Sequence, residues 1–352
     1  MVQPMISHCR PVFRGREREY VEECLRTGWV VTGPFVKRFE EALAKRLNRK
    51  YVVTVNSGTT ALTLALRAVG VETRTVVIVP ALTFKATANA VYANGGRVLH
   101  MDVAPDTWTL NLMPVREALW HGRTAPIQAI VSVHLYGVQP PAMPAPDSMV
   151  VPFVGPTRRV FEWPLIVEDA AAGVGNVVGD VAAVSFNGNK IVTAAGGGAV
   201  CTDRQVLAER IRAWSHQQSD VDGFMFGESN LRLSNLQAAI GLAQLEQLED
   251  FLAAKQRIAA RYTAELAGDD WHPQGGRSNY WQYGGLCRDA SGLVTHLRAQ
   301  GIEARRLWRP LADLPIANSL YRCGVLLPCS VDLSDEDQTT VIREVKRWIA
   351  SA

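Results

Sequence analysis

The stretch VSFNGNKIVTAAGGGAV, residues 184–200, determines how this chain is interpreted. A hydrophobic run ends at Ser185, a turn of Asn, Gly and Asn then presents Lys190, and three glycines follow at 196–198. Most lysines in proteins are solvated surface residues. Lys190 instead follows a strand of buried type and precedes a glycine run, and this context favours an amine with a chemical role.

Short β-branched runs alternate with helical patterns on both sides of this stretch. Strands are predicted at 51–55, 75–79, 97–103, 127–137, 164–169 and 181–186, and helices at 35–48, 59–70 and 86–96. Runs that are apolar on both faces and separated by helices indicate a largely parallel sheet covered on each side. Ligands of such sheets bind beyond the carboxyl ends of strands, and Ser57, Asp169 and Lys190 all fall there.

The alternation of short strands and helices ends at about residue 231. One long helical stretch leads into a smaller region with a predicted strand at 280–287 and helices at 293–301 and 335–351. We place the boundary near residue 245, so that 1–245 form a large domain and 246–352 a small α+β domain. The proline-rich connection within 138–163 cannot hold a full crossover helix, and we interpret it as an irregular surface excursion.

Composition narrows the class of protein. The 352 residues carry a net charge of +3 and are 47% hydrophobic, which indicates a globular fold and argues against nucleic acid as a partner. The six cysteines contain no CxxC pair, so metal-ligand spacing is absent and reduced thiols are expected. An apolar span of about 18 residues is also lacking. We therefore expect a soluble, cytoplasmic protein without a membrane partner.

The segment VNSGTTAL presents small and hydroxyl residues between a predicted strand and a predicted helix. Free N–H groups at a helix start and the helix dipole favour an anion there. The hydroxyls of Ser57, Thr59 and Thr60 add possible donors. The same residue types are also good helix caps, so this segment alone leaves both interpretations open.

A carboxylate and an amine complete the pattern. Asp169 ends the apolar run LIVED, where burial would neutralise a carboxylate that has no partner, although a helix-capping role is an alternative. A cationic ring nitrogen would keep Asp169 ionised. A phosphate cradle, a carboxylate for a pyridinium nitrogen and an amine for a Schiff base are the three parts that pyridoxal phosphate requires.

Longer segments strengthen this interpretation. The chain resembles the DegT/DnrJ/EryC1/StrS family of sugar aminotransferases, within the fold-type I pyridoxal phosphate enzymes. The matching segments span roughly residues 27–330 and include VNSGTTALTLALRAVGV, VPALTFKATANAV, VHLYG, IVEDAA, SFNGNK, LRLSNLQAAIGLAQLEQL and GIEARRLWRPL. The resemblance implies an α/β fold with a mostly parallel central sheet, a smaller C-terminal α+β domain, and a homodimer.

The resemblance also implies a role for individual residues. Lys190 matches the lysine that forms the Schiff base, and Asp169 the aspartate at the pyridine nitrogen. Phe84 matches the aromatic residue that stacks on the cofactor ring. The residues that match or flank phosphate contacts are Ser57, Gly58, Thr59, Ser185 and, reaching the neighbouring subunit's cofactor, Asn230. The residues expected to bind the nucleotide-sugar substrate are Thr32, His134, Arg305, Arg306 and Trp308.

Three departures from the family pattern bear on the substrate. Ala172 stands where members usually carry Gln or His, a glutamate before the glycines is missing, and the RPL segment continues as ADLP. The expected reaction is transfer of an amino group from glutamate or glutamine to a nucleotide-linked 4-keto-6-deoxy sugar. The alternatives are a keto-sugar dehydratase, although resembling enzymes have histidine in place of the lysine, and an inactive regulatory or scaffold homologue.

Overall fold

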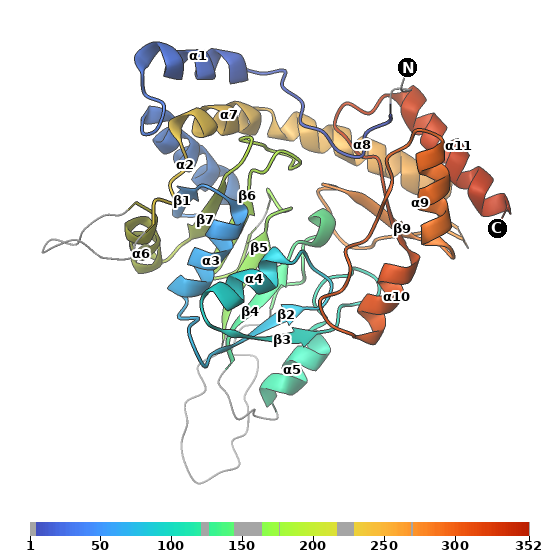
Figure 1. The fold of residues 1–352 in the computed structure, drawn as a ribbon, viewed down its shortest axis with the longest axis horizontal. Helices are drawn as coiled ribbons and strands as arrows, with labels where there is room; N and C mark the ends of the chain where they lie inside the picture. Colours follow the sequence, from blue (N-terminus) through green and yellow to red (C-terminus); the bar gives the residue numbers. More distant parts are fainter. Residues whose placement is uncertain are drawn as a thin grey trace, which may run out of the picture.

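A computed structural model describes residues 5–120, 127–143, 164–175, 177–216, 229–268 and 270–351. Within them a seven-stranded sheet forms the centre of the molecule (Figure 1). Its strands are β1 (Tyr51–Val55), β2 (Val76–Pro80), β3 (Arg97–Met101), β4 (Ile127–Val133), β5 (Leu165–Ala170), β6 (Val181–Ser185) and β7 (Gly198–Thr202). Their spatial order is β1-β7-β6-β5-β4-β2-β3.

The sheet is parallel except at β7, which is antiparallel to both of its neighbours, β1 and β6. The largely parallel sheet predicted from the sequence is thereby confirmed. Because β1 and β6 both oppose β7, they run in the same direction as β5. The carboxyl ends of β1, β5 and β6 therefore meet at one edge of the sheet, which is where Ser57, Asp169 and Ser185 stand.

Helices cover both faces of this sheet (Figure 1). The helices of this part are α1 (Glu17–Thr27), α2 (Pro34–Leu47), α3 (Gly58–Ala68), α4 (Ala86–Ala93), α5 (Leu112–Trp120), α6 (Gln205–His216) and α7 (Asn235–Glu246), and α1 packs on α7. The helix predicted at 35–48 is confirmed as α2, and its residues Phe35, Phe39, Leu43 and Leu47 are all buried. This spacing of four residues places them on one side of the helix.

A second, antiparallel sheet has its own core in the C-terminal part. Its order is β10 (Arg305–Arg306), β11 (Gly324–Leu327), β9 (Tyr283–Leu286) and β8 (His272–Pro273). The helices of this part are α8 (Leu248–Leu266), α9 (Ala290–Ala299), α10 (Pro315–Cys323) and α11 (Asp335–Ser351). The core of this part includes Tyr262, Trp271, Leu297 and Val345.

The long helical stretch predicted after residue 231 is two helices. Gln247 has φ −101° and ψ 3° and separates α7 from α8. The domain boundary near residue 245 stays a prediction. Within the predicted irregular excursion, 138–143 contain neither helix nor strand, and 144–163 lie outside the described residues.

β1 is an edge strand whose outward hydrogen-bonding groups are occupied by side chains of the same chain. The Thr54 N–H donates to Glu40 Oε1 at 2.8 Å, and Arg212 donates to the Val52 carbonyl at 3.1 Å. One position further on, the Asn56 N–H donates to the Leu231 carbonyl at 2.7 Å. Three outward backbone groups of this edge are thus already paired.

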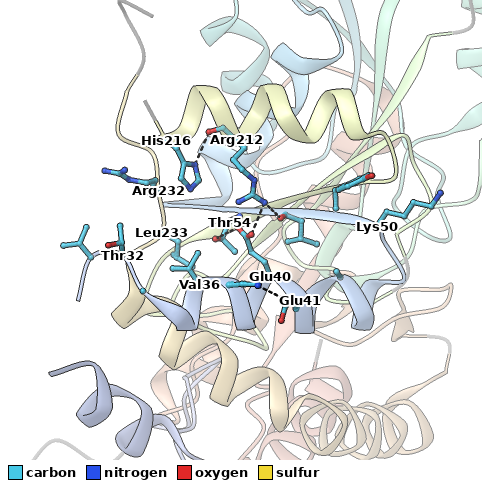
Figure 2. A pocket seen from close by; sticks show the side chains of 16 residues that line it. Thr32, Val36, Glu40, Glu41, Lys50, Thr54, Arg212, His216, Arg232 and Leu233 are labelled. Carbon is cyan, nitrogen blue, oxygen red and sulfur yellow. Dashed lines mark hydrogen bonds and ion pairs between the residues drawn. The ribbon is translucent and has the colours of Figure 1, made fainter. Parts of the chain in front are cut away.

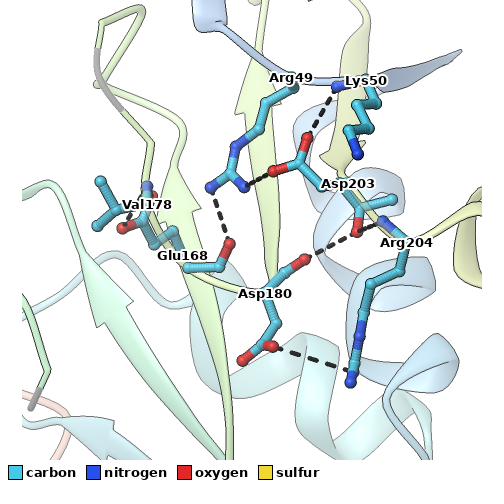
Figure 3. A network of polar contacts seen from close by, with 9 residues as sticks. Arg49, Lys50, Glu168, Val178, Asp180, Asp203 and Arg204 are labelled. Carbon is cyan, nitrogen blue, oxygen red and sulfur yellow. Dashed lines mark hydrogen bonds and ion pairs between the residues drawn. The ribbon is translucent and has the colours of Figure 1, made fainter. Parts of the chain in front are cut away.

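A polar network lies at the end of the sheet opposite to the edge where Ser57, Asp169 and Ser185 stand (Figure 3). Arg49, just before β1, pairs with Asp203 at 2.8 Å and also donates to the Gly179 carbonyl at 2.8 Å. Asp180, just before β6, lies 3.9 Å from Arg204. These contacts tie the starts of β1 and β6 to the end of β7. Among the described helices, none is long and apolar enough to cross a membrane.

Candidate active site

The N-terminus of α3 forms the first wall of the site. Ser57 caps the helix, because its Oγ accepts the Thr60 N–H at 3.0 Å. The first helical hydrogen bond runs from the Ala61 N–H to the Ser57 carbonyl, so the N–H groups of Gly58 and Thr59 have no helical acceptor. Both sequence interpretations therefore hold together: the hydroxyl of Ser57 is a cap, and the backbone that follows presents free donors.

Close packing brings this helix start against β6 and β7. A Cβ on Gly58 would lie 2.6 Å from the Cβ of Ser185, and one on Gly198 would lie 2.6 Å from the Ser57 carbonyl oxygen. Only glycine fits at either position without displacing a neighbour. Ser185 is 6% exposed and joins the wall built by Gly58 and Thr59. Three residues predicted to contact a phosphate are thus brought together.

Asp169 forms the second wall, at the end of β5. The residue is 7% exposed, and its carboxylate accepts hydrogen bonds from the Thr87 hydroxyl at 2.7 Å and the Ala171 N–H at 3.2 Å. The backbone N–H of Thr87 donates in turn to the Phe84 carbonyl at 3.0 Å. Thr87 thereby fixes the aromatic residue Phe84 relative to Asp169.

Lys190 forms the third wall, on the turn after β6. Its Nζ lies 3.6 Å from the ring centroid of Trp281 and has no hydrogen-bond partner among the described residues. Burial lowers the pKa of this amine from 10.5 to about 8, and the charges of Asp169 and Cys9 oppose the shift. A lysine with a lowered pKa is available as a neutral amine near physiological pH.

An aromatic series extends from Lys190 to the surface. Beyond Trp281, Trp308 lies 6.2 Å away between ring centroids, and Phe84 lies 5.2 Å from Trp308. Tyr136 packs on Trp308 at 4.7 Å, and its hydroxyl accepts the Trp308 N–H at 2.9 Å. Phe84 is 47% exposed, so one face of its ring is open to a planar ligand.

The predicted substrate residues lie in three separate places. His134 is 4% exposed, and its Nε2 stands 3.5 Å from the Glu168 carboxylate. Arg305 pairs with Glu303. Arg306 donates to the hydroxyl of Ser291 and to the carbonyls of Tyr321 and Arg322. Of the five, only Trp308 adjoins the aromatic series, and the substrate roles stay predictions.

Thr32 lies in a cavity of about 550 Å³ between α2, β1 and α6 (Figure 2). The charged groups on its walls include Glu40, Arg212 and Arg232, and neither Lys190 nor Asp169 lines it. Asn230 is exposed, and its Oδ1 accepts the Arg232 Nε–H at 3.1 Å. Because Leu231 is bonded to Asn56, Asn230 stands near the start of α3 of its own chain.

Three residues of the site are absent from the sequence-based prediction. Thr87 holds Asp169, Trp281 supports Lys190, and Asn279 donates to the Ala172 carbonyl at 2.7 Å. The hydroxyls of Thr83 and Thr87 form a hydrogen bond of 2.9 Å. Their spacing of four residues, on either side of Phe84, is visible in the sequence and could have indicated Thr87. Trp281 and Asn279 come from the distant C-terminal part and carry no local signal.

These walls fit the pyridoxal phosphate that the sequence predicts. The free N–H groups of Gly58 and Thr59, at a helix start that glycine alone allows, suit a phosphate. Asp169 is a buried carboxylate that retains capacity to accept a further hydrogen bond. Lys190 supplies an amine of lowered pKa, and Phe84 an open aromatic face.

Comparison with known proteins supports the same identification. A profile described as the DegT/DnrJ/EryC1/StrS aminotransferase family matches residues 12–346. GDP-perosamine synthase of Caulobacter vibrioides is 36% identical over 96% of this chain and 97% of its own. EpsN of Bacillus subtilis, named as a pyridoxal phosphate-dependent aminotransferase, is 31% identical over 97% of both chains. A crystal structure of an aminotransferase from Brucella abortus superposes with a TM-score of 0.82, 28% identity and 95% coverage of both chains.

Proposed function

Because the chain belongs to the DegT/DnrJ/EryC1/StrS aminotransferase family, we propose that it moves an amino group from glutamate or glutamine to a nucleotide-linked 4-keto-6-deoxy sugar. Membership makes it a pyridoxal phosphate-dependent sugar aminotransferase. The proposal adds the donor, the sugar class and an end use in cell-surface glycans or antibiotic sugars.

One observation carries the proposal: the amine of Lys190, the carboxylate of Asp169 and the start of α3 converge at one edge of the sheet. When bound, pyridoxal phosphate supplies an electron sink for the carbon that carries the nitrogen. The N–H groups of Gly58 and Thr59 would bind its phosphate. Asp169, oriented by Thr87, would hold a proton on its ring nitrogen.

Lys190 then has two tasks, to bind the aldehyde and to move a proton as a general base. Both need the neutral amine. With a pKa of about 8, roughly a tenth of the amine is neutral at pH 7, far more than for an ordinary lysine. The lowered pKa therefore supports both tasks without a second base.

The names of relatives support a nucleotide-linked substrate. GDP-perosamine synthases of Caulobacter vibrioides and Escherichia coli O157:H7 are 36% and 30% identical to this chain. In this chain Arg305 is only partly covered by its pair with Glu303, so its guanidinium is available to a diphosphate. The partners proposed for the enzyme are thus an amino acid donor, a nucleotide sugar and a second copy of the chain. The cytoplasmic location stays a prediction.

The test begins with spectroscopy of the protein loaded with pyridoxal phosphate. We expect a visible absorption band that bleaches when glutamate is added. Borohydride reduction before bleaching should attach the cofactor to the peptide that contains Lys190, and Lys190→Ala should give neither the band nor the label. The pyridoxamine form is then incubated with GDP-, UDP- and dTDP-linked 4-keto-6-deoxy hexoses, and amination is followed by mass spectrometry.

Each outcome decides between the alternatives. A label on another side chain contradicts the role of Lys190, and a protein that never takes up cofactor favours the inactive homologue. A band that persists in glutamate and glutamine, together with loss of a sugar hydroxyl, favours the dehydratase. Bleaching without amination of any of the three sugars retains the aminotransferase and rejects the proposed sugar class.

A further inference from the structure

The face of Trp281 lies directly against the amine of Lys190. The distance from Nζ to the ring centroid is 3.6 Å, and the indole is 2% exposed. The negative face of an aromatic ring attracts an ammonium group, most strongly where water is excluded. Nζ forms no hydrogen bond among the described residues, so the ring is a direct favourable contact of an amine that has no acceptor there.

Three hydrogen bonds fix the position of Trp281. Its Nε1–H donates to the carbonyl of Asn189 at 2.6 Å, so the ring is bonded to the residue that precedes Lys190. Its backbone N–H donates to Asn279 Oδ1 at 2.9 Å, and its carbonyl accepts the buried amine of Lys255 at 3.1 Å. The ring and the lysine are therefore parts of one rigid unit.

The same unit reaches the carboxylate wall of the site. Asn279 donates through its side-chain amide to the Ala172 carbonyl at 2.7 Å, in the loop that follows Asp169. Ala172 has no polar side chain, and its backbone is held by the C-terminal part instead. Trp281 thus stands between the loop after Asp169 and the turn that presents Lys190.

Few other groups act on the charge of Lys190. Asp169 and Cys9 are the titratable groups whose charges favour its protonated form, and burial opposes them. Lys255 lies on the other side of a cavity of about 10 Å³ that Lys190, Cys9 and Arg10 also line. Lys255 is held by the carbonyls of Trp281 and Cys329, which keeps its amine directed at backbone oxygen.

We infer that the ring of Trp281 is the surface on which the free Lys190 amine rests. The ring stabilises the ammonium form, and it keeps the amine beside the cofactor site whenever the amine is not bonded to the aldehyde. The inference rests on the proposed function of Lys190. Trp281 touches the reacting nitrogen, whereas Asn279 is a positioning residue that acts through Trp281.

The test measures how the reactivity of Lys190 in cofactor-free protein depends on pH. Cyanate modifies only neutral amines, and peptide mass spectrometry gives the modified fraction of each lysine. Trp281→Leu keeps the site apolar but removes the ring, so the midpoint for Lys190 should fall by about one pH unit, the size of a desolvated cation–π contact. Trp281→Phe should give a smaller fall, and exposed Lys346 in the same digests should not change.

A midpoint that stays constant in folded Trp281→Leu overturns the inference, and so does a rise, which would mean that the indole acts only by excluding water. If Trp281→Leu fails to fold, Trp281→Phe and Asn279→Ala must each lower the midpoint for Lys190. A constant midpoint in either variant then overturns the inference. Borohydride trapping of wild-type protein separates this result from the proposed function, because trapping tests the Schiff base and cyanate tests only the free amine.

Discussion

Two lysines of this chain are withdrawn from solvent for opposite reasons: Lys255 is buried, and Lys190 is half-buried. Lys255 is 1% exposed, and its amine donates to the carbonyls of Trp281 and Cys329. Lys190 faces a ring and has no acceptor among the described residues. Partial loss of hydration without a protein acceptor is costly for an ammonium group, and that cost is what lowers the pKa of Lys190. Lys255 is thus a structural residue, while Lys190 is maintained in a state suited to reaction.

The cost at Lys190 predicts a stability gain on its removal. In the folded cofactor-free protein its pKa is about 8, against an ordinary 10.5, so between these values the unfolded chain holds more protons. Lys190→Met should raise the free energy of unfolding at pH 7 by up to about 3 kcal/mol. The gain should shrink as pH rises from 8 toward 10.5.

Urea unfolding of both cofactor-free proteins at pH 7 and at pH 9.5 checks this prediction. A stability difference that does not depend on pH would show that packing of the methionine, and not the charge of the lysine, is responsible.

Sequence reasoning found the residues whose chemistry is unusual for their position. Lys190 on a glycine-flanked turn and Asp169 at the end of an apolar strand are visible locally. The structure brings them to one edge, together with the start of α3. Trp281 and Asn279 could not be found this way, because 89 or more positions separate each from Lys190 in the chain. Their role exists only through packing of the C-terminal part on the turn.

At the scale of elements, the N-terminal segment 5–12 joins the two parts of the molecule. Ile6 forms a bridge with Ile302, the His8 carbonyl accepts the Cys329 N–H at 3.0 Å, and Cys9 Sγ donates to the Asn189 carbonyl at 3.3 Å. The segment therefore runs from the second sheet to the turn of Lys190. His8 lies inside it, fully buried, and neither ring nitrogen has a hydrogen-bond partner within the part of the chain that the structure describes.

His8 predicts a loss of stability in acid. Burial, aided by the charge of Arg305, lowers its pKa from 6.5 to about 4, so between these values only the unfolded chain binds the proton. The free energy of unfolding of the wild type should therefore fall as pH decreases from 6.5 to 4. This contribution is up to about 3 kcal/mol, and His8→Leu should lack it.

Parallel denaturation series of wild type and His8→Leu at pH 7, 5.5 and 4.5 isolate the effect, because the carboxylates common to both proteins cancel in the difference. If the free energies of unfolding of the two proteins differ by the same amount at all three pH values, His8 is excluded as the group responsible.

Elements were predictable where one physical signal dominated. β1 was predicted with its exact bounds, since Tyr51–Val55 is apolar and β-branched and is followed by small residues. β7 lies in the glycine-rich run of Gly198–Thr202, where composition indicates a loop, and only its pairing with β1 and β6 makes it a strand. The break at Gln247 was missed because no glycine or proline marks it.

At the scale of the whole molecule, several large apolar side chains are exposed to solvent. Trp29 and Val31 are 56% and 58% exposed, and Phe84 adds a third large apolar side chain. Asn230 stands at the rim of the phosphate cradle of its own chain, as fixed by the bond between Leu231 and Asn56. In a symmetric dimer whose cradles share this rim, Asn230 of each copy would serve the other.

Complementation between inactive subunits tests the shared site. Lys190→Ala and Asn230→Ala should each be inactive alone, while an equal mixture exchanged under mild denaturant should recover about a quarter of wild-type activity, because half of the dimers are mixed and each has one intact site. A mixture that remains inactive, although mass spectrometry detects mixed dimers, means that Asn230 acts within its own chain.

The occupied edge of β1 has a consequence for behaviour in concentrated solution. Glu40 accepts the Thr54 N–H, and Arg212 donates to the Val52 carbonyl. With these outward groups occupied, the edge is a poor template on which a neighbouring molecule could extend the sheet. Fibrous self-association along this border would first have to break an ion pair, so crowding alone is a weak stimulus for it. Replacement of Glu40 by alanine would free the Thr54 N–H and leave Arg212 without its ion pair.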